Sequence, residues 1–324
     1  MDATMKAMQV TGPRRLEMVE APRPSPATGQ VLVRMEALSV CGTDMTAYRH
    51  PMPEESYPLA PGTPCHECAG TIVESRAPGW PEGQRVIHLP GLDLDGGSEF
   101  VVSEPSNMVA LPRDGDPGEW LMCQPWGTVL FSLERIGTVV GKRVVVLGQG
   151  CIGLLFTMTL RRMGAGQIIA VDLIDHRLEA SRRHGADLAV NALAEDPVGA
   201  VIEATGGQGA DLVVEACGDP AALEQGIQMA RMYGTVVLFG LPEEKTVPFD
   251  YFSAVTKQLT LVGTVSATCE APARPIQLAV DLKRQGSPDL SWLVTHRLPF
   301  AEAPRGYEMY AARSDQVLKV VLQM

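Results

Sequence analysis

Hydrophobic and polar positions alternate differently in two parts of the chain. Residues 1 to about 110 contain short alternating segments, such as residues 30–36, and clusters of proline and glycine separate them. This pattern is typical of β-strands joined by turns. After residue 142, strand-like apolar runs alternate with helical patterns, with strands expected at 143–147, 167–171, 211–215 and 235–239 and helices at 152–163, 176–184 and 221–232. That alternation predicts an α/β fold in which helices cover both faces of a parallel sheet.

The last part of the chain returns to β character. Residues 317–322 form an apolar, strand-like run, and we expect this segment to rejoin the first domain. The chain then divides into a β-rich domain over residues 1–124, an inserted α/β domain over 125–265, and a return to the first domain over 266–324. With 324 residues, the chain is long enough to bury two separate cores.

Composition and charge limit the partners. A net charge of −11 repels nucleic acids and anionic membrane surfaces, so neither is expected as a partner. The longest apolar stretch, residues 151–160, is shorter than the roughly 20 residues that a membrane span needs. Seven cysteines are an odd number, and the N-terminal residues lack an apolar signal region, which favours a reducing cytoplasm.

A glycine-rich motif lies between the first expected strand of the α/β domain and the helix that follows. In this context a G-x-G-x-x-G string predicts a dinucleotide site, because the glycines allow a tight turn and the helix N-terminus can hold a pyrophosphate. The residues expected to bind there are Gly148, Gly150, Cys151, Ile152 and Gly153.

The second expected strand indicates which dinucleotide binds. Asp172 lies at the end of this strand, where its carboxylate can accept hydrogen bonds from both hydroxyls of the adenine ribose. A 2′-phosphate would meet like charge at this position, so the sequence favours NAD over NADP. Arg177 follows closely enough to keep NADP as the less favoured alternative.

Three residues in the first domain form a candidate metal site. Cys41 is followed by His66 and Glu67, which are adjacent in the sequence. A thiolate, an imidazole and a carboxylate suit Zn²⁺, and three protein ligands leave a coordination position open, as in catalytic zinc sites. Cys65 and Cys68 also form a C-x-x-C pattern, but the sequence has no second pair to complete a structural site.

Together these segments resemble the zinc-dependent medium-chain alcohol dehydrogenase family, in particular its sorbitol and threonine dehydrogenase branch. The resemblance extends over nearly the whole chain and implies a partly open, GroES-like β-barrel catalytic domain with an inserted Rossmann domain. The segments that carry it are Val40-Cys41-Gly42-Thr43-Asp44, His66-Glu67-Cys68-Ala69-Gly70, Gly83-Gln84-Arg85-Val86, the glycine motif at 148–153, Glu215-Ala216-Cys217-Gly218, Thr295-His296-Arg297 and Lys319-Val320-Val321-Leu322.

The resemblance implies roles for the residues around the metal. Cys41 and His66 would be zinc ligands, and Glu67 would be a third ligand or would exchange with water at the metal. Thr43 would pass the substrate proton outward, and Asp44 would orient His66. The histidine that often continues the proton relay is absent, and His50 is a candidate substitute.

A further ligand position is unusual in this chain. Gln124 occupies the position of a carboxylate in the polyol branch, so we expect Cys41, His66, Glu67 and a water to complete the zinc site. Cys123 is the alternative ligand, in a register that changes the spacing to the glycine motif by one residue. Residues 87–100 contain none of the cysteines that hold the family's structural zinc, so one catalytic zinc and no structural zinc are expected.

The resemblance also implies contacts to the rest of the cofactor. The nicotinamide would be flanked by Thr128, by Leu238 to Gly240 and by Thr264 to Ser266, and Lys319 would approach the pyrophosphate. The family forms dimers and tetramers through its Rossmann domain, and the apolar run at residues 259–262 could form such an edge. A homodimer or homotetramer is therefore expected.

The function implied is hydride transfer between NAD and a secondary alcohol that resembles a polyol, sugar or cyclitol. One alternative is a zinc-free, NAD(P)H-dependent reductase of the same fold, and another is a redox-inactive nucleotide-binding protein. The dehydrogenase is favoured over the redox-inactive protein because the chain has the full set of expected site residues, Cys41, Thr43, Asp44, His66 and Glu67. Candidate contacts for the small alcohol or ketone substrate are Tyr48, His50, Trp126 and Arg297.

Overall fold

The structure is a computed structural model that describes residues 3–91, 94–265, 271, 273–286 and 288–324. The chain forms two compact units. Unit 1 comprises Met1–Gly127 and Thr268–Met324, and unit 2 comprises Thr128–Ala267. The unit boundaries lie at 127/128 and 267/268, a few residues beyond the expected 124/125 and 265/266.

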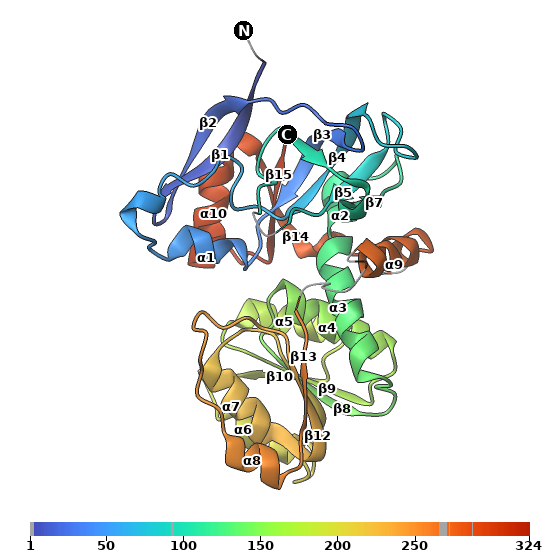
Figure 1. The fold of residues 1–324 in the computed structure, drawn as a ribbon. Coiled ribbons are helices and arrows are strands. Elements are labelled where there is room, and N and C mark those ends of the chain that lie inside the picture. The colour runs from blue at the N-terminus through green and yellow to red at the C-terminus, as the bar shows by residue number, and fades with distance from the viewer. Residues whose placement is uncertain (1–2, 92–93, 266–270, 272, 287) are drawn as a thin grey trace. The chain divides into compact units, whose positions relative to one another are not determined.

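Unit 1 is mainly β-structure (Figure 1). Its helices are α1 (Asp44–Arg49), α2 (Pro117–Leu121), the first part of α3 (Cys123–Ile136), α9 (Ala273–Arg284) and α10 (Ala303–Ala312), with short 3-10 turns at Glu54–Ser56, Pro105–Asn107, Ser291–Leu293 and Phe300–Glu302. Its strands are β1 (Thr4–Gly12), β2 (Arg15–Pro22), β3 (Val31–Ser39), β4 (Glu67–Ser75), β5 (Arg85–His88), β6 (Phe100–Ser103), β7 (Met108–Ala110), β14 (Val294–Pro299) and β15 (Lys319–Gln323).

The sheet of unit 1 joins the two ends of the chain. Its strand order is β14-β15-β3-β4-β5-β7, with β6 also paired to β3, while β1 and β2 form a separate antiparallel pair. The C-terminal strand β15 pairs antiparallel with β3, and Val321 lies opposite Ser39. This pairing brings residue 319 close to the end of β3.

Unit 2 is an α/β unit whose helices cover both faces of its sheet (Figure 1). Its strands are β8 (Arg143–Leu147), β9 (Gln167–Asp172), β10 (Leu188–Asn191), β11 (Ala210–Glu215), β12 (Ala230–Leu238) and β13 (Thr260–Gly263). Its helices are the rest of α3, α4 (Cys151–Arg162), α5 (Asp175–Arg183), α6 (Pro197–Ala204), α7 (Pro220–Met229) and α8 (Tyr251–Thr256).

The six strands of unit 2 are all parallel, in the order β10-β9-β8-β11-β12-β13. The chain moves outward from β8 first in one direction and then in the other. This is the doubly wound order of a Rossmann fold, whose ligand crevice lies beside the carboxyl end of the strand where the order reverses. The predicted fold class is confirmed, and that strand is β8.

One predicted helix is too long. The helix expected at 221–232 ends at Met229, and Ala230 already pairs with Ala210 of β11. The reason is an ion pair between distant residues, since Arg231 Nε lies 2.5 Å from Asp211 Oδ1. Asp211 also pairs with Arg143, so one carboxylate ties together β8, β11 and β12 at their N-terminal ends.

Strand β13 is an exposed edge of the sheet. Leu261 on this strand is 40% exposed, and the neighbouring α8 exposes Tyr251 and Phe252 by 72% and 76%. An open apolar edge can pair with another chain. The predicted oligomer through residues 259–262 stays a prediction. Within the described residues, no helix combines the length and apolar character that crossing a membrane requires.

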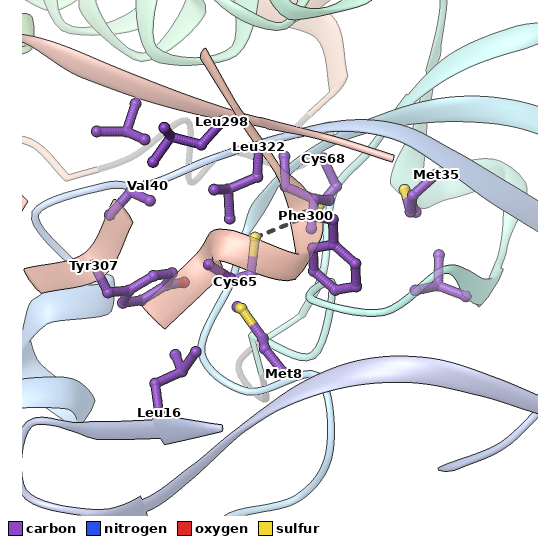
Figure 2. Packing of buried hydrophobic residues seen from close by; sticks show 14 of the residues in the cluster. Met8, Leu16, Met35, Val40, Cys65, Cys68, Leu298, Phe300, Tyr307 and Leu322 are labelled. Carbon is purple, nitrogen blue, oxygen red and sulfur yellow. Dashed lines mark hydrogen bonds between the residues drawn. The ribbon is translucent and has the colours of Figure 1, made fainter. Parts of the chain in front are cut away.

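Cys65 and Cys68, the C-x-x-C pair, lie in the core of unit 1. Cys65 and Cys68 are 1% and 0% exposed, and their Sγ atoms lie 3.8 Å apart among apolar side chains (Figure 2). Gly96 packs directly over this pair, because a Cβ on it would come within 2.1 Å of Cys68 Sγ. Burial raises the pKa of the Cys68 thiol, and the contact with Cys68 together with burial raises the pKa of the Cys65 thiol. Both residues therefore pack as small apolar side chains.

His88 is a buried, neutral imidazole. It is 4% exposed at the end of β5, and its Nδ1 lies 2.8 Å from Ser103 Oγ. Burial lowers its pKa from 6.5 to about 4. The unfolded chain therefore takes up a proton at His88 at a higher pH than the folded chain does, so that stability decreases as the pH falls from about 6.5 to 4.

We expect His88→Asn to flatten this pH dependence. The wild type should lose about 3 kcal/mol more unfolding free energy than the variant between pH 7 and pH 4, because the shift in pKa is about 2.5 units at about 1.4 kcal/mol each. Urea unfolding at several pH values measures both proteins. Parallel pH profiles would contradict this account of His88.

Candidate functional site

The ends of two paired strands bring the candidate zinc ligands together. Cys41 follows β3, and His66 and Glu67 lie at the start of β4. These strands are antiparallel with Ser39 opposite Glu67, so the segment after β3 lies beside the segment before β4. One ligand atom from each of Cys41, His66 and Glu67 can be chosen so that the three lie within 4.8 Å of one another. This group matches the three ligands predicted from the sequence.

Asp44 holds two of these residues. One of its oxygens lies 2.7 Å from His66 Nδ1, and the other accepts the backbone N–H of Cys41 at 2.9 Å. Because Nδ1 is engaged, Nε2 is the nitrogen of His66 that can bind a metal. Burial disfavours protonation of His66, but the charges of Asp44 and Cys41 raise its pKa above the ordinary value. Asp44 thus has the geometry of a residue that orients a metal-binding imidazole.

Glu67 forms a buried ion pair. Lys319 Nζ lies 2.7 and 2.6 Å from the two carboxylate oxygens, and 3.3 Å from the carbonyl oxygen of Val40. Burial opposes ionisation of Glu67, yet the Lys319 ammonium lowers its pKa below the ordinary value. Lys319 is 1% exposed and was expected to approach the pyrophosphate. The structure gives it a different contact, and a role at the cofactor stays a prediction.

Gln124 lies against the ligand segment. Its Nε2 donates to the carbonyl oxygen of His66 at 2.7 Å, which fixes the orientation of the amide. Its Oε1 is buried and has no hydrogen-bond partner among the residues that the structure describes. Cys123 is fully buried, burial raises the pKa of its thiol to about 12, and it does not belong to the three-residue group. Of the two alternatives for the further position, the geometry favours Gln124.

The donor set fits a zinc ion. Zn²⁺ in proteins binds sulfur, imidazole nitrogen and carboxylate oxygen. The three residues offer a thiol, an imidazole whose Nδ1 is engaged, and an ionised carboxylate. The unsatisfied Oε1 of Gln124 offers a neutral acceptor next to this group, suited to a ligand atom or to the proton of a bound water. The proposed water-completed site is therefore chemically consistent.

The remaining predicted residues of unit 1 are those expected in proton transfer or in contact with the substrate. Thr43 is exposed and directly precedes α1, and His50 ends this helix with its backbone N–H on the Thr46 oxygen. Their roles in proton transfer stay predictions. Tyr48 is a core residue rather than a substrate contact, since it is 2% exposed and its hydroxyl bonds to Glu308 at 3.0 Å. Trp126 is 3% exposed, and Arg297 pairs with Asp116.

The glycine motif of unit 2 has the geometry of a dinucleotide loop. Gly148 has a φ of +85°, and a Cβ on Gly153 would come within 1.7 Å of the Gly148 oxygen. Gly150 is the N-cap of α4, whose first residues are Cys151 and Ile152. The N–H groups at the start of a helix in this position can bind a phosphate, and the predicted contacts of this loop to a pyrophosphate stay predictions.

Asp172 lies beside this loop. Its Oδ2 accepts the N–H of Gln149 at 2.5 Å, and its Oδ1 accepts those of Leu173 and Ile174 at 2.7 and 3.0 Å. Arg177 Nη1 lies 4.0 Å from Oδ2, and the buried Arg177 Nε has no hydrogen-bond partner within the described residues. Both residues that were considered for NAD or NADP recognition are thus adjacent to the loop.

The residues expected near the nicotinamide lie at or just beyond the carboxyl ends of β12 and β13, apart from Thr128 in α3. The Thr264 N–H donates to the Leu238 oxygen at 3.0 Å, and the buried Thr264 Oγ1 has no partner among the described residues. A Cβ on Gly240 would come within 2.0 Å of Gly218 N. Ser266 lies outside the described residues. These contacts to a cofactor stay predictions.

Sequence reasoning missed a supporting role for Glu215. It is 4% exposed at the end of β11, and its Oε1 accepts the N–H groups of Cys217 and Gly218, both at 2.7 Å. Its backbone oxygen accepts from Phe239 and Gly240. Glu215 therefore holds the loops after two strands together. The sequence did contain a sign of this role, because a carboxylate at the end of an apolar strand needs partners to offset the cost of burying its charge.

Comparison with known proteins agrees with both units. The family model described as "Alcohol dehydrogenase GroES-like domain" matches residues 27–129, and the one described as "Zinc-binding dehydrogenase" matches residues 151–281. An alcohol dehydrogenase of Cupriavidus necator is 30% identical over 100% of both chains. The chain belongs to the zinc-dependent medium-chain dehydrogenase family.

Two further members of this family illustrate the range of relatives. Sorbitol dehydrogenase of Macaca fascicularis is 26% identical over 98% of this chain and 95% of its own. The solved structure of alcohol dehydrogenase TADH from Thermus sp. ATN1 has a TM-score of 0.89 at 26% identity, covering 99% of this chain and 100% of its own. The family resemblance expected from the motifs is confirmed.

We expect Lys319→Met to destabilise unit 1 by about 3–5 kcal/mol, because it leaves the buried Glu67 carboxylate without its partner. The double variant Lys319→Met with Glu67→Gln should recover most of this loss, since no buried charge remains. Urea unfolding of chelator-treated protein measures both. Lys6→Met, at an exposed lysine of the same unit, is the control and should change stability by less than about 0.5 kcal/mol. An equal loss in the single and double variants would show that the ion pair is not the cause.

Proposed function

We propose that this protein is a zinc-dependent dehydrogenase that transfers a hydride between a secondary alcohol and NAD. Its membership of the family shows that the protein is an NAD(P)-dependent alcohol oxidoreductase. The observation that carries the zinc part is the convergence of Cys41, His66 and Glu67 with an imidazole oriented by Asp44. The sorbitol dehydrogenase relative supports a polyol, sugar or cyclitol as the substrate class.

The residues of this chain have distinct tasks in the proposal. When bound, zinc supplies a Lewis acid to the hydroxyl oxygen and the nicotinamide supplies the hydride acceptor. Cys41 and His66 would hold the metal, with Glu67 as a third ligand or in exchange with water, and the bond of Asp44 to His66 Nδ1 would leave Nε2 available to it. Thr43 is exposed at the start of α1 and would carry the substrate proton toward solvent. The Lys319 ammonium neutralises Glu67, so Glu67 can remain ionised without a metal bond.

Metal analysis tests the zinc proposal. We expect about one zinc per chain in the purified protein and loss of NAD-linked activity on chelation. Cys41→Ser should lose the zinc and at least about 100-fold in kcat/KM, because it removes a ligand. Cys123→Ser is the matched control, since it changes a neighbouring buried cysteine outside the three-residue group, and should keep its zinc.

Other outcomes identify the alternatives. NAD(P)H-dependent reduction of activated C=C or C=O bonds without bound metal would support the zinc-free reductase. Binding of NADH without turnover across polyols, amino alcohols and ketones would support a redox-inactive nucleotide-binding protein. Either result would overturn the zinc-dependent function.

We propose NAD rather than NADP as the preferred cofactor, on the basis of the Asp172 carboxylate beside the glycine loop. Asp172→Asn should reduce the preference for NAD in kcat/KM by about tenfold or more, because it removes the charge that repels a 2′-phosphate. Glu179→Gln removes one charge from the exposed part of α5 and should leave the preference unchanged. A wild type that prefers NADP would contradict this proposal and would point to Arg177.

A further inference from the structure

Helix α10 reaches the segment that carries the zinc ligands from the other end of the chain. Tyr307 on this helix is 1% exposed, and its hydroxyl donates a hydrogen bond to the carbonyl oxygen of Pro64. Pro64 is followed directly by Cys65 and His66. Figure 2 shows the Tyr307 ring in the unit 1 core with its hydroxyl directed toward the Cys65 segment. The contact therefore lies two residues before a candidate ligand.

The helix and the ring that carry the Tyr307 hydroxyl are closely packed. Gly306 allows α10 to approach β15 closely, since a Cβ on it would meet side-chain atoms of Leu322 and Val320 at 3.2 Å. The Tyr307 ring packs edge-on against Tyr48, with 5.5 Å between ring centroids. The close approach of α10 to β15 and the contact of the ring with Tyr48 leave the ring little freedom to move.

The segment from Pro64 to His66 is fixed from three directions. Asp44 engages the ring of His66, Gln124 Nε2 engages its backbone oxygen at 2.7 Å, and Tyr307 engages the Pro64 oxygen. The first two contacts hold His66 itself. The third acts on the chain that enters His66, together with the backbone bonds that Cys65 makes to the Leu94 oxygen at 2.6 Å and accepts from the Gly96 N–H at 3.0 Å.

We infer that Tyr307 is a positioning residue for the metal centre: its hydroxyl fixes the Pro64 carbonyl and thereby the approach of His66 to the metal. The inference rests on the proposed zinc site, and it concerns metal geometry rather than a contact with substrate. Outer residues that orient metal ligands typically change metal affinity by about 10–100-fold when they are removed.

Tyr307→Phe and Tyr48→Phe form a matched pair for the test. Each removes one hydroxyl from the same stacked pair of buried tyrosines. The Tyr48 hydroxyl bonds to Glu308 and to the Arg14 oxygen, away from the segment that carries His66. Two measurements compare them with wild type: the rate of zinc release to a chromophoric chelator, and the visible absorption bands of the cobalt-substituted protein.

We expect Tyr307→Phe to release zinc about tenfold faster and to shift the cobalt bands. Tyr48→Phe should match wild type in both measurements. Thermal unfolding of the metal-free proteins measures any general loss of stability, which both variants can show. A change at the metal is the part of the effect that this loss does not account for. Gly306→Ala provides a second test if Tyr307→Phe does not fold, because its Cβ crowds Leu322 and Val320 of β15 at 3.2 Å while the hydroxyl is kept, and it should shift the cobalt bands too.

Three results would overturn the inference. Wild-type zinc release and cobalt bands in folded Tyr307→Phe would show that the hydroxyl does not position the metal, while the zinc-dependent function would stand. Equal changes in Tyr307→Phe and Tyr48→Phe would assign the effect to core packing. A wild-type protein that binds neither zinc nor cobalt would contradict the zinc-dependent function as well.

Discussion

The buried ion pair between Glu67 and Lys319 is the interaction on which the candidate metal site depends. A carboxylate without solvent is unstable unless a positive charge and hydrogen bonds compensate for its lost hydration. Lys319 provides both, with bonds of 2.7 and 2.6 Å to the two oxygens. The pair joins the first residue of β4 to the first residue of β15. The charge at the site is therefore balanced only when the C-terminal strand has paired with β3.

The other supports of the site come from separate parts of the chain. Asp44 lies at the start of α1, Gln124 at the start of α3 and Tyr307 in α10, and each contacts the segment 64–66. These contacts hold the imidazole of a metal ligand in one orientation, with a defined nitrogen left for the metal. They also restrict rotation of the ring.

The cofactor loop is organised differently, because its parts are neighbours in the sequence. The strand β8, the glycine turn and the start of α4 follow one another directly, and Asp172 ends the next strand. Local geometry alone requires glycine where φ is positive or where a Cβ would clash, as at Gly148 and Gly153. These residues could therefore be predicted individually. The end of α7 could not, because the chain leaves the helix where Arg231 reaches Asp211 on another strand.

The sequence by itself determined the α/β class, the inserted domain, the dinucleotide loop and the grouping of Cys41, His66 and Glu67 as candidate ligands. It could do so because strand and helix periodicity, glycine turns and ligand types are properties of short segments. Only the tertiary structure decided that Lys319 neutralises Glu67, that Gln124 bonds to the backbone of His66, and that Tyr48 belongs to the core. These are pairings between segments far apart in the chain, and their energies depend on burial and distance, which no local pattern contains.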